Sequence, residues 1–264
     1  MPEGPEVSYM RHVLEKKFGG CVLKSIKIKG GRYIRHGIPK ELKDFMKNDL
    51  PLKILKFDNK GKFLYMKMEG DIYIGIVLAM SGHVLFEPTP YTHYEFKTDC
   101  GVFYLEDVRN FATLHIYTKD EIENKLKTIG PDLLNEKISN KLFIERIQKY
   151  PKKEIATVLI DQKVISGVGN YLRADGLYKS KINPHTLVKD LSEKELISLK
   201  KHLQKIMKWA LKSHIQHKYM RSYTFLVYGR KKTDKGEEVV ANKIEKGRSI
   251  YWVPTVQCPK GMAL

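Results

Sequence analysis

The hydrophobic pattern of this chain changes its period once, and that change limits the folds available to it. From about residue 21 to residue 118, apolar residues alternate with polar ones, as at Ile26 and Ile28 among lysines. After Ile129-Gly130-Pro131-Asp132, the apolar residues recur at helical spacing. A β region followed by a helical region predicts an α+β chain with more than one domain.

The first 129 residues are expected to form an antiparallel β-sandwich domain with a leading helix, with a barrel as the alternative. Apolar side chains share one face of a helix over residues 5–18, which Gly19-Gly20 ends. Two hairpins are predicted from alternating runs on either side of short polar turns. They join residues 63–68 to 72–80 and residues 94–97 to 102–105.

The rest of the chain is expected to form a helical domain over residues 136–235 and a hairpin over residues 236–264. Ser192 and Glu195 have the spacing of a capping box at a helix start. An apolar stripe follows in this helix, at Leu196, Leu199, Leu203, Ile206 and Ala210. Residues 237–244 and 249–256 read as two short strands joined at 245–248.

The charge of the chain points to a polyanion as its partner. It has 48 Lys and Arg against 30 Asp and Glu, a net charge of +18. Residues 201–250 carry thirteen of these basic residues and four acidic ones, so half of the excess lies there. Such a field attracts nucleic acid. A membrane surface is the weaker candidate, because no basic amphipathic helix or lipidation motif is found.

Cysteine usage favours a reducing, intracellular compartment. Cys21, Cys100 and Cys258 are far apart and form no CxxC pair, which argues against a disulfide framework and a structural zinc site. No signal peptide or membrane-length apolar run is present in the sequence. We therefore expect a soluble intracellular protein, in the nucleus or another compartment that contains DNA.

The N-terminus, Met1-Pro2-Glu3-Gly4-Pro5-Glu6, supports two interpretations. Removal of Met1 would expose the secondary amine of Pro2, and an α-amino group titrates near pH ~8, so part of it is nucleophilic at neutral pH. Attack of this amine on a sugar aldehyde carbon would form an iminium, which is covalent catalysis. The structural alternative is a helix start, in which Pro5 occupies the first turn and the acids favour the N-terminus.

A glycine-rich turn precedes a predicted helix near residue 170. Gly167 and Gly169 permit close backbone approach, and Asn170 suits an N-cap position. Free backbone N–H groups and the helix dipole would make this point an anion site. An ordinary turn between helices is the alternative.

These motifs together resemble the Fpg/Nei family of DNA glycosylases. Residues 167–178, GVGNYLRADGLY, are similar to the helix–two-turn–helix signature of that family. Residues 2–6 resemble its N-terminus, Gly130-Pro131-Asp132 its interdomain segment and residues 246–251 its terminal hairpin. The four landmarks occur in the family order and span nearly the whole chain.

The resemblance implies a catalytic set of four residues. Pro2 matches the nucleophile that attacks C1′ of the damaged nucleoside, and Glu3 the acid that assists sugar-ring opening and moves protons. Glu6 matches a second acid, for which a structural role in the helix and a chemical role both remain open. Lys62 matches a lysine that holds the phosphate beside the lesion, with Lys60 as a less favoured neighbour.

The resemblance also implies a DNA-binding set. Met80, Arg109 and Phe111 match residues that fill the space left by an extruded nucleotide, although Met80 and Phe111 could instead be core residues. Asn170 and Arg248 match a pair that grips the backbone phosphates. The partner expected is damaged DNA, bound by a monomer without a membrane.

The predicted hairpin lacks the four zinc-binding cysteines that many family members have. It resembles the zincless finger of the eukaryotic and viral endonuclease VIII-like branch, which implies no metal and no cofactor. The expected function is a bifunctional DNA glycosylase and AP lyase in base excision repair, favouring oxidised pyrimidines and hydantoin lesions, with β,δ-elimination. The alternatives are a non-catalytic DNA-binding protein and a basic structural protein of a nucleoprotein particle. The presence of Pro2, Glu3 and Lys62 favours the enzyme.

Overall fold

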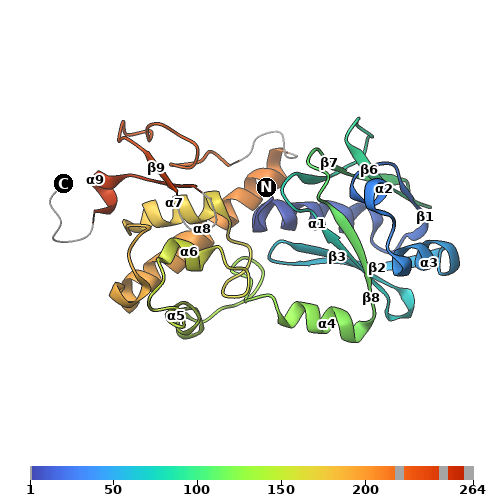
Figure 1. Ribbon diagram of the computed structural model, residues 1–264, viewed down its shortest axis with the longest axis horizontal. Helices are drawn as coiled ribbons and strands as arrows, with labels where there is room; N and C mark the ends of the chain where they lie inside the picture. Colours follow the sequence, from blue (N-terminus) through green and yellow to red (C-terminus); the bar gives the residue numbers. More distant parts are fainter. Residues whose placement is uncertain (1, 218–222, 244–248, 259–264) are drawn as a thin grey trace. The chain divides into compact units, whose positions relative to one another are not determined.

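The computed structural model describes residues 2–217, 223–243 and 249–258. The chain divides into two compact units, which, apart from residues 3–5, are drawn in the blue to green and the yellow to red parts of Figure 1. The first consists of Met1–Pro2 and Glu6–Thr128, and the second of Glu3–Pro5 and Ile129–Leu264. Within the described residues, no helix is both long and apolar enough to cross a membrane.

The first unit is built on an eight-stranded antiparallel sheet with the order β5-β7-β6-β1-β2-β3-β4-β8. Helix α1 (Gly4–Phe18) precedes the sheet, as predicted. Its strands are β1 (Val22–Ile28), β2 (Leu52–Lys60), β3 (Phe63–Met68), β4 (Tyr73–Val77), β5 (Gly82–Leu85), β6 (Thr92–Thr98), β7 (Val102–Asp107) and β8 (Thr113–Tyr117). The two predicted hairpins are confirmed as β3–β4 and β6–β7.

The sheet folds into two halves that share one core. In the described part of the chain, its halves are joined where β1 pairs with β2, at Val22 with Lys53 and Leu23 with Leu52. Phe57 of β2 meets Phe103 of β7 edge to face, with ring centroids 6.0 Å apart. Val7, Leu14 and Phe18 of α1 belong to the same buried cluster. The predicted sandwich with a leading helix is therefore confirmed, and β5 and β8 remain edge strands rather than closing a barrel.

Short helices interrupt the region that we predicted to be β throughout. They are α2 (Arg32–His36) and α3 (Lys40–Asn48). The 3₁₀ turn η1 (Glu69–Asp71) forms the predicted hairpin turn, and α4 (Lys119–Lys127) follows the predicted β region. Helix α3 buries Leu42 and Phe45, which are three residues apart and so lie on one helical face. A single apolar pair of this kind carries too little periodicity to identify a helix from the sequence.

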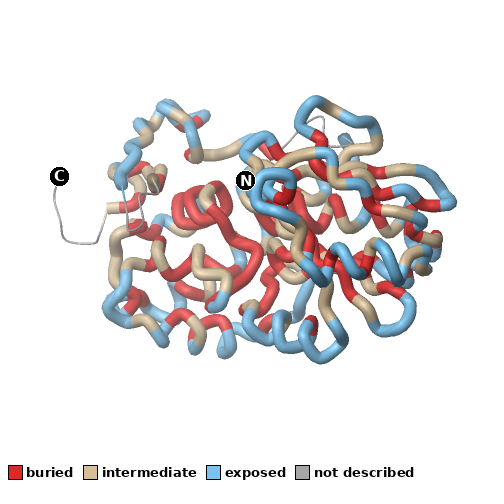
Figure 2. The backbone as a smooth tube through the Cα atoms, turned by 45° about the vertical axis from the view of Figure 1, so that its right-hand side comes forward, coloured by how far each residue is buried: buried red, intermediate tan, exposed pale blue. Residues whose placement is uncertain are grey.

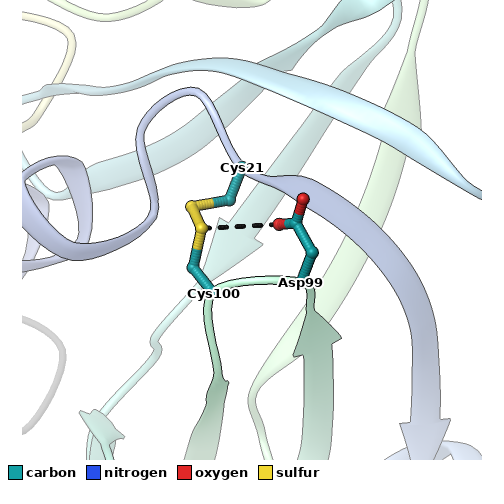
Figure 3. A group of neighbouring side chains, drawn as sticks. All are labelled: Cys21, Asp99 and Cys100. Carbon is teal, nitrogen blue, oxygen red and sulfur yellow. Dashed lines mark hydrogen bonds between the residues drawn. A yellow bond between two sulfur atoms is a disulfide. The ribbon is translucent and has the colours of Figure 1, made fainter.

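A disulfide joins Cys21 to Cys100, and the prediction that argued against disulfides is wrong for this pair (Figure 3). Cys21 follows α1, and Cys100 lies in the β6–β7 turn, 79 residues further along. Asp99 in the same turn accepts a hydrogen bond from the Val22 N–H at 2.8 Å. The pairing of β1 with β6 brings the two cysteines together, which their spacing in the sequence did not indicate.

The second unit is mainly helical. It contains α5 (Asn140–Gln148), α6 (Ile155–Leu159), α7 (Asn170–Ser180), the 3₁₀ turn η2 (Val188–Asp190), α8 (Glu193–His217), β9 (Val240–Lys243), β10 (Ser249–Trp252) and α9 (Pro254–Gln257). Helix α7 is buried from Tyr171 to Tyr178. Figure 2 shows buried segments of the backbone in red. The Leu203 side chain of α8 packs directly on the α7 backbone at Gly176, where a Cβ would lie 2.5 Å from Leu203 Cδ2.

The predictions for α8 are confirmed. Ser192 Oγ accepts the Glu195 N–H, and the Glu195 carboxylate accepts the Ser192 N–H, which is a capping box. The predicted apolar stripe is buried in the core of the second unit along its whole length.

The C-terminal hairpin is shorter than predicted. Strands β9 and β10 pair antiparallel, and the Trp252 indole N–H donates to Asn242 at 2.9 Å. The second strand was predicted to reach residue 256, but Pro254 begins α9 instead. Proline lacks an N–H and suits the first turn of a helix, so it ends the strand there. The predicted turn at 245–248 lies outside the described residues.

Candidate active site and nucleic-acid interface

The glycine of the N-terminal motif contacts a glycine of the turn before α7. The Gly4 N–H donates to the Gly167 carbonyl at 2.8 Å. A Cβ on Gly4 would lie 3.1 Å from Gly167 Cα, and Gly167 has a φ of +90°. Both positions therefore require glycine, the first for close approach and the second for its backbone conformation.

The segment 130–132 packs on the same turn. The Ser166 N–H donates to the Pro131 carbonyl at 2.9 Å, and the Gly130 N–H donates to the Gln162 carbonyl at 2.8 Å. A Cβ on Gly130 would lie 2.7 Å from the Lys163 carbonyl oxygen. Two motifs that are far apart in the sequence thus meet at one turn in the second unit.

Glu3 binds the N-terminus of α7 through its carboxylate, and only 2% of the residue is exposed. Its oxygens accept the backbone N–H groups of Gly169 at 2.8 Å, Tyr171 at 3.0 Å and Leu172 at 3.3 Å. The donors and the positive end of the helix dipole stabilise the anion. The predicted anion site therefore exists, but the anion that occupies it belongs to the protein.

Asn170 is the first residue of α7, and Gly169 takes the N-cap position that we predicted for Asn170. The side chain of Asn170 is instead held by Arg173, whose Nη2 lies 3.3 Å from its Oδ1. The same guanidinium donates to the Ser249 carbonyl at 3.1 Å and to the Ala156 carbonyl at 3.1 Å. Arg173 is fully buried and so connects Asn170 to strand β10.

Tyr228 is a candidate site residue that the sequence did not reveal. Its phenol interacts with the Asn170 side chain. Burial raises the pKa of this phenol, and the charge of Glu3 raises it further. Asp175 of α7 fixes this segment by accepting the backbone N–H groups of Leu226, Val227 and Tyr228. No periodic pattern marks Tyr228, which depends on a contact 53 residues away.

The remaining predicted catalytic residues lie in the first unit. Pro2 is buried, and Glu6 is 9% exposed. Lys62 is half-buried in the β2–β3 turn, where Gly61 has a φ of +56°. The Asn59 amide donates to Ser8 Oγ of α1 and to the Gly61 carbonyl, both at 3.2 Å. The turn that carries Lys62 is thereby fastened to the N-terminal helix.

The predicted space-filling residues are not core residues. Met80 is 39% exposed and Phe111 is 47% exposed, and Arg109 is exposed as well. The Arg109 guanidinium lies over the Phe111 ring, 5.3 Å from its centroid. Large apolar side chains of this kind, beside a cation, suit contact with a base stack. Met80 and Phe111 therefore remain available for such contact.

The predicted site residues fall into one group in each unit. Glu3 and Asn170 meet at the start of α7 in the second unit, while Pro2, Glu6, Lys62, Met80, Arg109 and Phe111 belong to the first. Arg248 lies outside the described residues.

Protein-family models match segments of both units. Residues 1–114 match the N-terminal domain of formamidopyrimidine-DNA glycosylase, residues 129–220 its helix–two-turn–helix domain and residues 213–258 its C-terminal domain. The glycosylase of Geobacillus kaustophilus is 31% identical over 204 residues, 74% of this chain and 73% of the relative. That of Pelotomaculum thermopropionicum is 25% identical and covers 97% of this chain and 99% of the relative.

Solved structures agree with this assignment. The complex of the Lactococcus lactis enzyme with abasic-site DNA has a TM-score of 0.82 at 26% identity, covering 97% of this chain and all of that one. The complex of the same enzyme with DNA that contains an oxidised pyrimidine has a TM-score of 0.83 at 27% identity, covering 98% and 100%. The chain has the three domains in order and aligns with whole relatives, and it therefore belongs to the formamidopyrimidine-DNA glycosylase family.

Proposed function

We propose that this base-excision-repair glycosylase is bifunctional, removing an oxidised base and then cleaving the strand with the Pro2 nitrogen as its nucleophile. The observation that carries the proposal is the anchoring of Glu3. Its carboxylate is buried on three backbone donors, which fixes the residue bonded directly to Pro2. An acid exposed at the surface near a chain end would not need three backbone N–H donors to hold its carboxylate. The alternative of a DNA-binding protein without chemistry leaves this anchoring unexplained.

The chemistry follows from a secondary amine. The unprotonated Pro2 nitrogen bonds to C1′, and the base leaves with the electrons of the glycosidic bond and takes up a proton. Opening of the sugar ring, assisted by Glu3, produces a positively charged iminium. Loss of a C2′ proton then expels the 3′ phosphate, and a second elimination expels the 5′ phosphate. Water releases the sugar fragment and regenerates the amine.

Glu6 and Lys62 support these steps in the proposal. Glu6 lies on the first turn of α1 and is nearly buried, which suits a residue that orders the N-terminus. Lys62 is half-buried on a turn tied to α1 through Asn59 and Ser8. A cation held there can bind the phosphate beside the lesion and stabilise developing negative charge.

Two groups of residues would contact DNA. Met80, Arg109 and Phe111 are exposed together and would fill the space of the extruded nucleotide. Asn170 and Arg248 would bind phosphates. For Asn170, the buried contact with Arg173 gives the amide a fixed orientation.

Oxidised pyrimidines and hydantoin lesions are the substrates that we favour. The hairpin carries no zinc-binding cysteines, which resembles the zincless endonuclease VIII-like branch. The Lactococcus lactis relative has been solved with DNA that contains an oxidised pyrimidine. The protein would act as a monomer without metal or cofactor, wherever the cell keeps its DNA.

Borohydride trapping tests the proposal directly. The protein is prepared with a cleavable N-terminal tag, and cleavage leaves Pro2 as the first residue. We expect a covalent adduct with an abasic-site duplex only after cleavage, while both forms bind the duplex equally. No adduct from the cleaved form would overturn the lyase assignment. An adduct of equal yield from the uncleaved form would overturn Pro2 as the nucleophile.

Strand products and a panel of lesions test the finer claims. Products that carry phosphate at both ends of the gap would support β,δ-elimination, and a remaining 3′ sugar fragment would contradict it. Faster release of 5-hydroxycytosine and hydantoins than of 8-oxoguanine would support the substrate preference.

A further inference from the structure

One buried carboxylate connects the two exposed segments that carry Met80, Arg109 and Phe111. Asp107, the last residue of β7, is fully buried. Its oxygens accept the Ser81 hydroxyl from the turn after Met80, and the backbone N–H groups of the following loop. These N–H groups belong to Arg109 at 3.1 Å, Phe111 at 2.5 Å and Ala112 at 2.6 Å.

Ser81 strengthens the same connection. Its hydroxyl oxygen also accepts the Arg109 N–H at 3.2 Å. The Met80 turn and the loop from residue 108 to 112 therefore share a hydrogen-bond network with Asp107 at its centre. All of these residues belong to the first unit.

The loop is also fixed from its buried side. The Tyr94 hydroxyl donates to the Ala112 carbonyl at 2.9 Å, and His93 Nε2 lies 2.6 Å from the Asp107 carbonyl oxygen. Tyr94 and His93 are both buried. Asn110 and Ala79 have positive φ angles of 60° and 51°. Such conformations are unfavourable for residues other than glycine and persist only where the surroundings enforce them.

This arrangement has a consequence for duplex DNA. Insertion of side chains between base pairs disrupts base stacking, and the free energy of the new protein–DNA contacts must offset that loss. A loop that became ordered only on binding would in addition lose about 1–2 kcal/mol of backbone entropy per residue. A loop already ordered by a buried carboxylate avoids that cost, which is preorganisation for binding.

We propose that Asp107 is a positioning residue that presents Met80, Arg109 and Phe111 as one rigid wedge for insertion into duplex DNA. The inference rests on the proposed function and adds to it a substrate requirement. In a single strand no neighbouring pair must be separated and no opposite base must be accommodated. Asp107 is then needed for action on a duplex and dispensable for action on a single strand.

The test compares trapping rates on one abasic-site oligonucleotide, alone and annealed. In Asp107→Asn, one acceptor oxygen becomes an amide that faces the N–H donors of the loop. We expect the ratio of duplex to single-strand trapping rates to fall about tenfold or more, as the loss of a charge-assisted hydrogen bond implies. Asp44→Asn, which removes an exposed charge on α3, should leave the ratio unchanged. Ser81→Ala, which perturbs the fold less, should lower it in the same direction.

Fluorescence provides a readout that does not require chemistry. A 2-aminopurine opposite the abasic site should become brighter when the wild-type protein unstacks it, and less so with Asp107→Asn. An equal loss of trapping on both substrates, or an unchanged ratio with unchanged fluorescence, would overturn the proposal. If the wild type traps neither substrate, the lyase assignment fails, whereas the fluorescence difference still decides the role of Asp107.

Discussion

The carboxylate of Glu3 lies 3.0 Å from the backbone nitrogen of Tyr171, a residue 168 positions further along the chain. This contact occupies the N-terminus of α7, which would otherwise be a site for a phosphate. Glu3 and the helix–two-turn–helix segment thus belong to the same compact unit.

Replacing Glu3 by Gln should slow the chemistry and weaken the fold. The amide keeps one acceptor but turns its NH₂ group toward backbone donors, so we expect a loss of about 1.5–3 kcal/mol in the free energy of unfolding. The trapping rate should fall at least about a hundredfold, as for loss of a general acid–base group. Urea denaturation and borohydride trapping measure the two effects. Glu193→Gln, an exposed acid in the first turn of α8, is the matched control and should change neither.

Arg173→Lys should separate the hairpin from α7. Lysine keeps the charge but has no planar fork, so the Ser249 carbonyl and Asn170 Oδ1 cannot both be reached. We expect the variant to lose about 1–3 kcal/mol of stability and to bind abasic DNA more weakly. Arg146→Lys is the control, since that guanidinium donates to Lys163 near the surface. If both variants bind DNA like the wild type, Arg173 has no positioning role.

Reduction of the disulfide should destabilise the first unit. Cross-linking two cysteines 79 residues apart restricts the unfolded chain, and such bonds typically contribute about 2–4 kcal/mol. Dithiothreitol should therefore lower the urea midpoint of the wild type. The double variant Cys21→Ser, Cys100→Ser should unfold at the lower midpoint and be insensitive to the reductant. Equal midpoints for the oxidised wild type and the double variant would show that the bond adds no stability.

Acid should weaken the loop that Asp107 organises. Burial alone would raise the pKa of Asp107, but hydrogen bonds from Ser81 and from the backbone of Ala112, Phe111 and Arg109 outweigh it, so the pKa lies below its ordinary value. The ionised carboxylate therefore stabilises the fold above the unfolded pKa of about 3.9, and this stabilisation is lost as the pH falls through the lower, folded value. The difference in stability between wild type and Asp107→Asn should shrink between pH 6 and pH 3. A difference that stays constant with pH would contradict this account.

Local patterns in the sequence determined the elements that depend on near neighbours. The capping box at Ser192 and Glu195 and the apolar stripe behind it specify α8, because both act within one or two helical turns. Alternation and turn residues likewise specified the β3–β4 and β6–β7 hairpins. The motifs in their order indicated the glycosylase family, which the family matches confirm.

Only the tertiary structure decided which distant groups meet. Three contacts join residues more than seventy positions apart: the Cys21–Cys100 disulfide, the hydrogen bonds of Glu3 to α7, and the hydrogen bond from Arg173 to Ser249. Nothing in the local sequence separates Arg173 from an ordinary helix-surface arginine, or Asp107 from a solvated strand end. Their roles arise because packing removes water and brings specific donors and acceptors within hydrogen-bond distance of them.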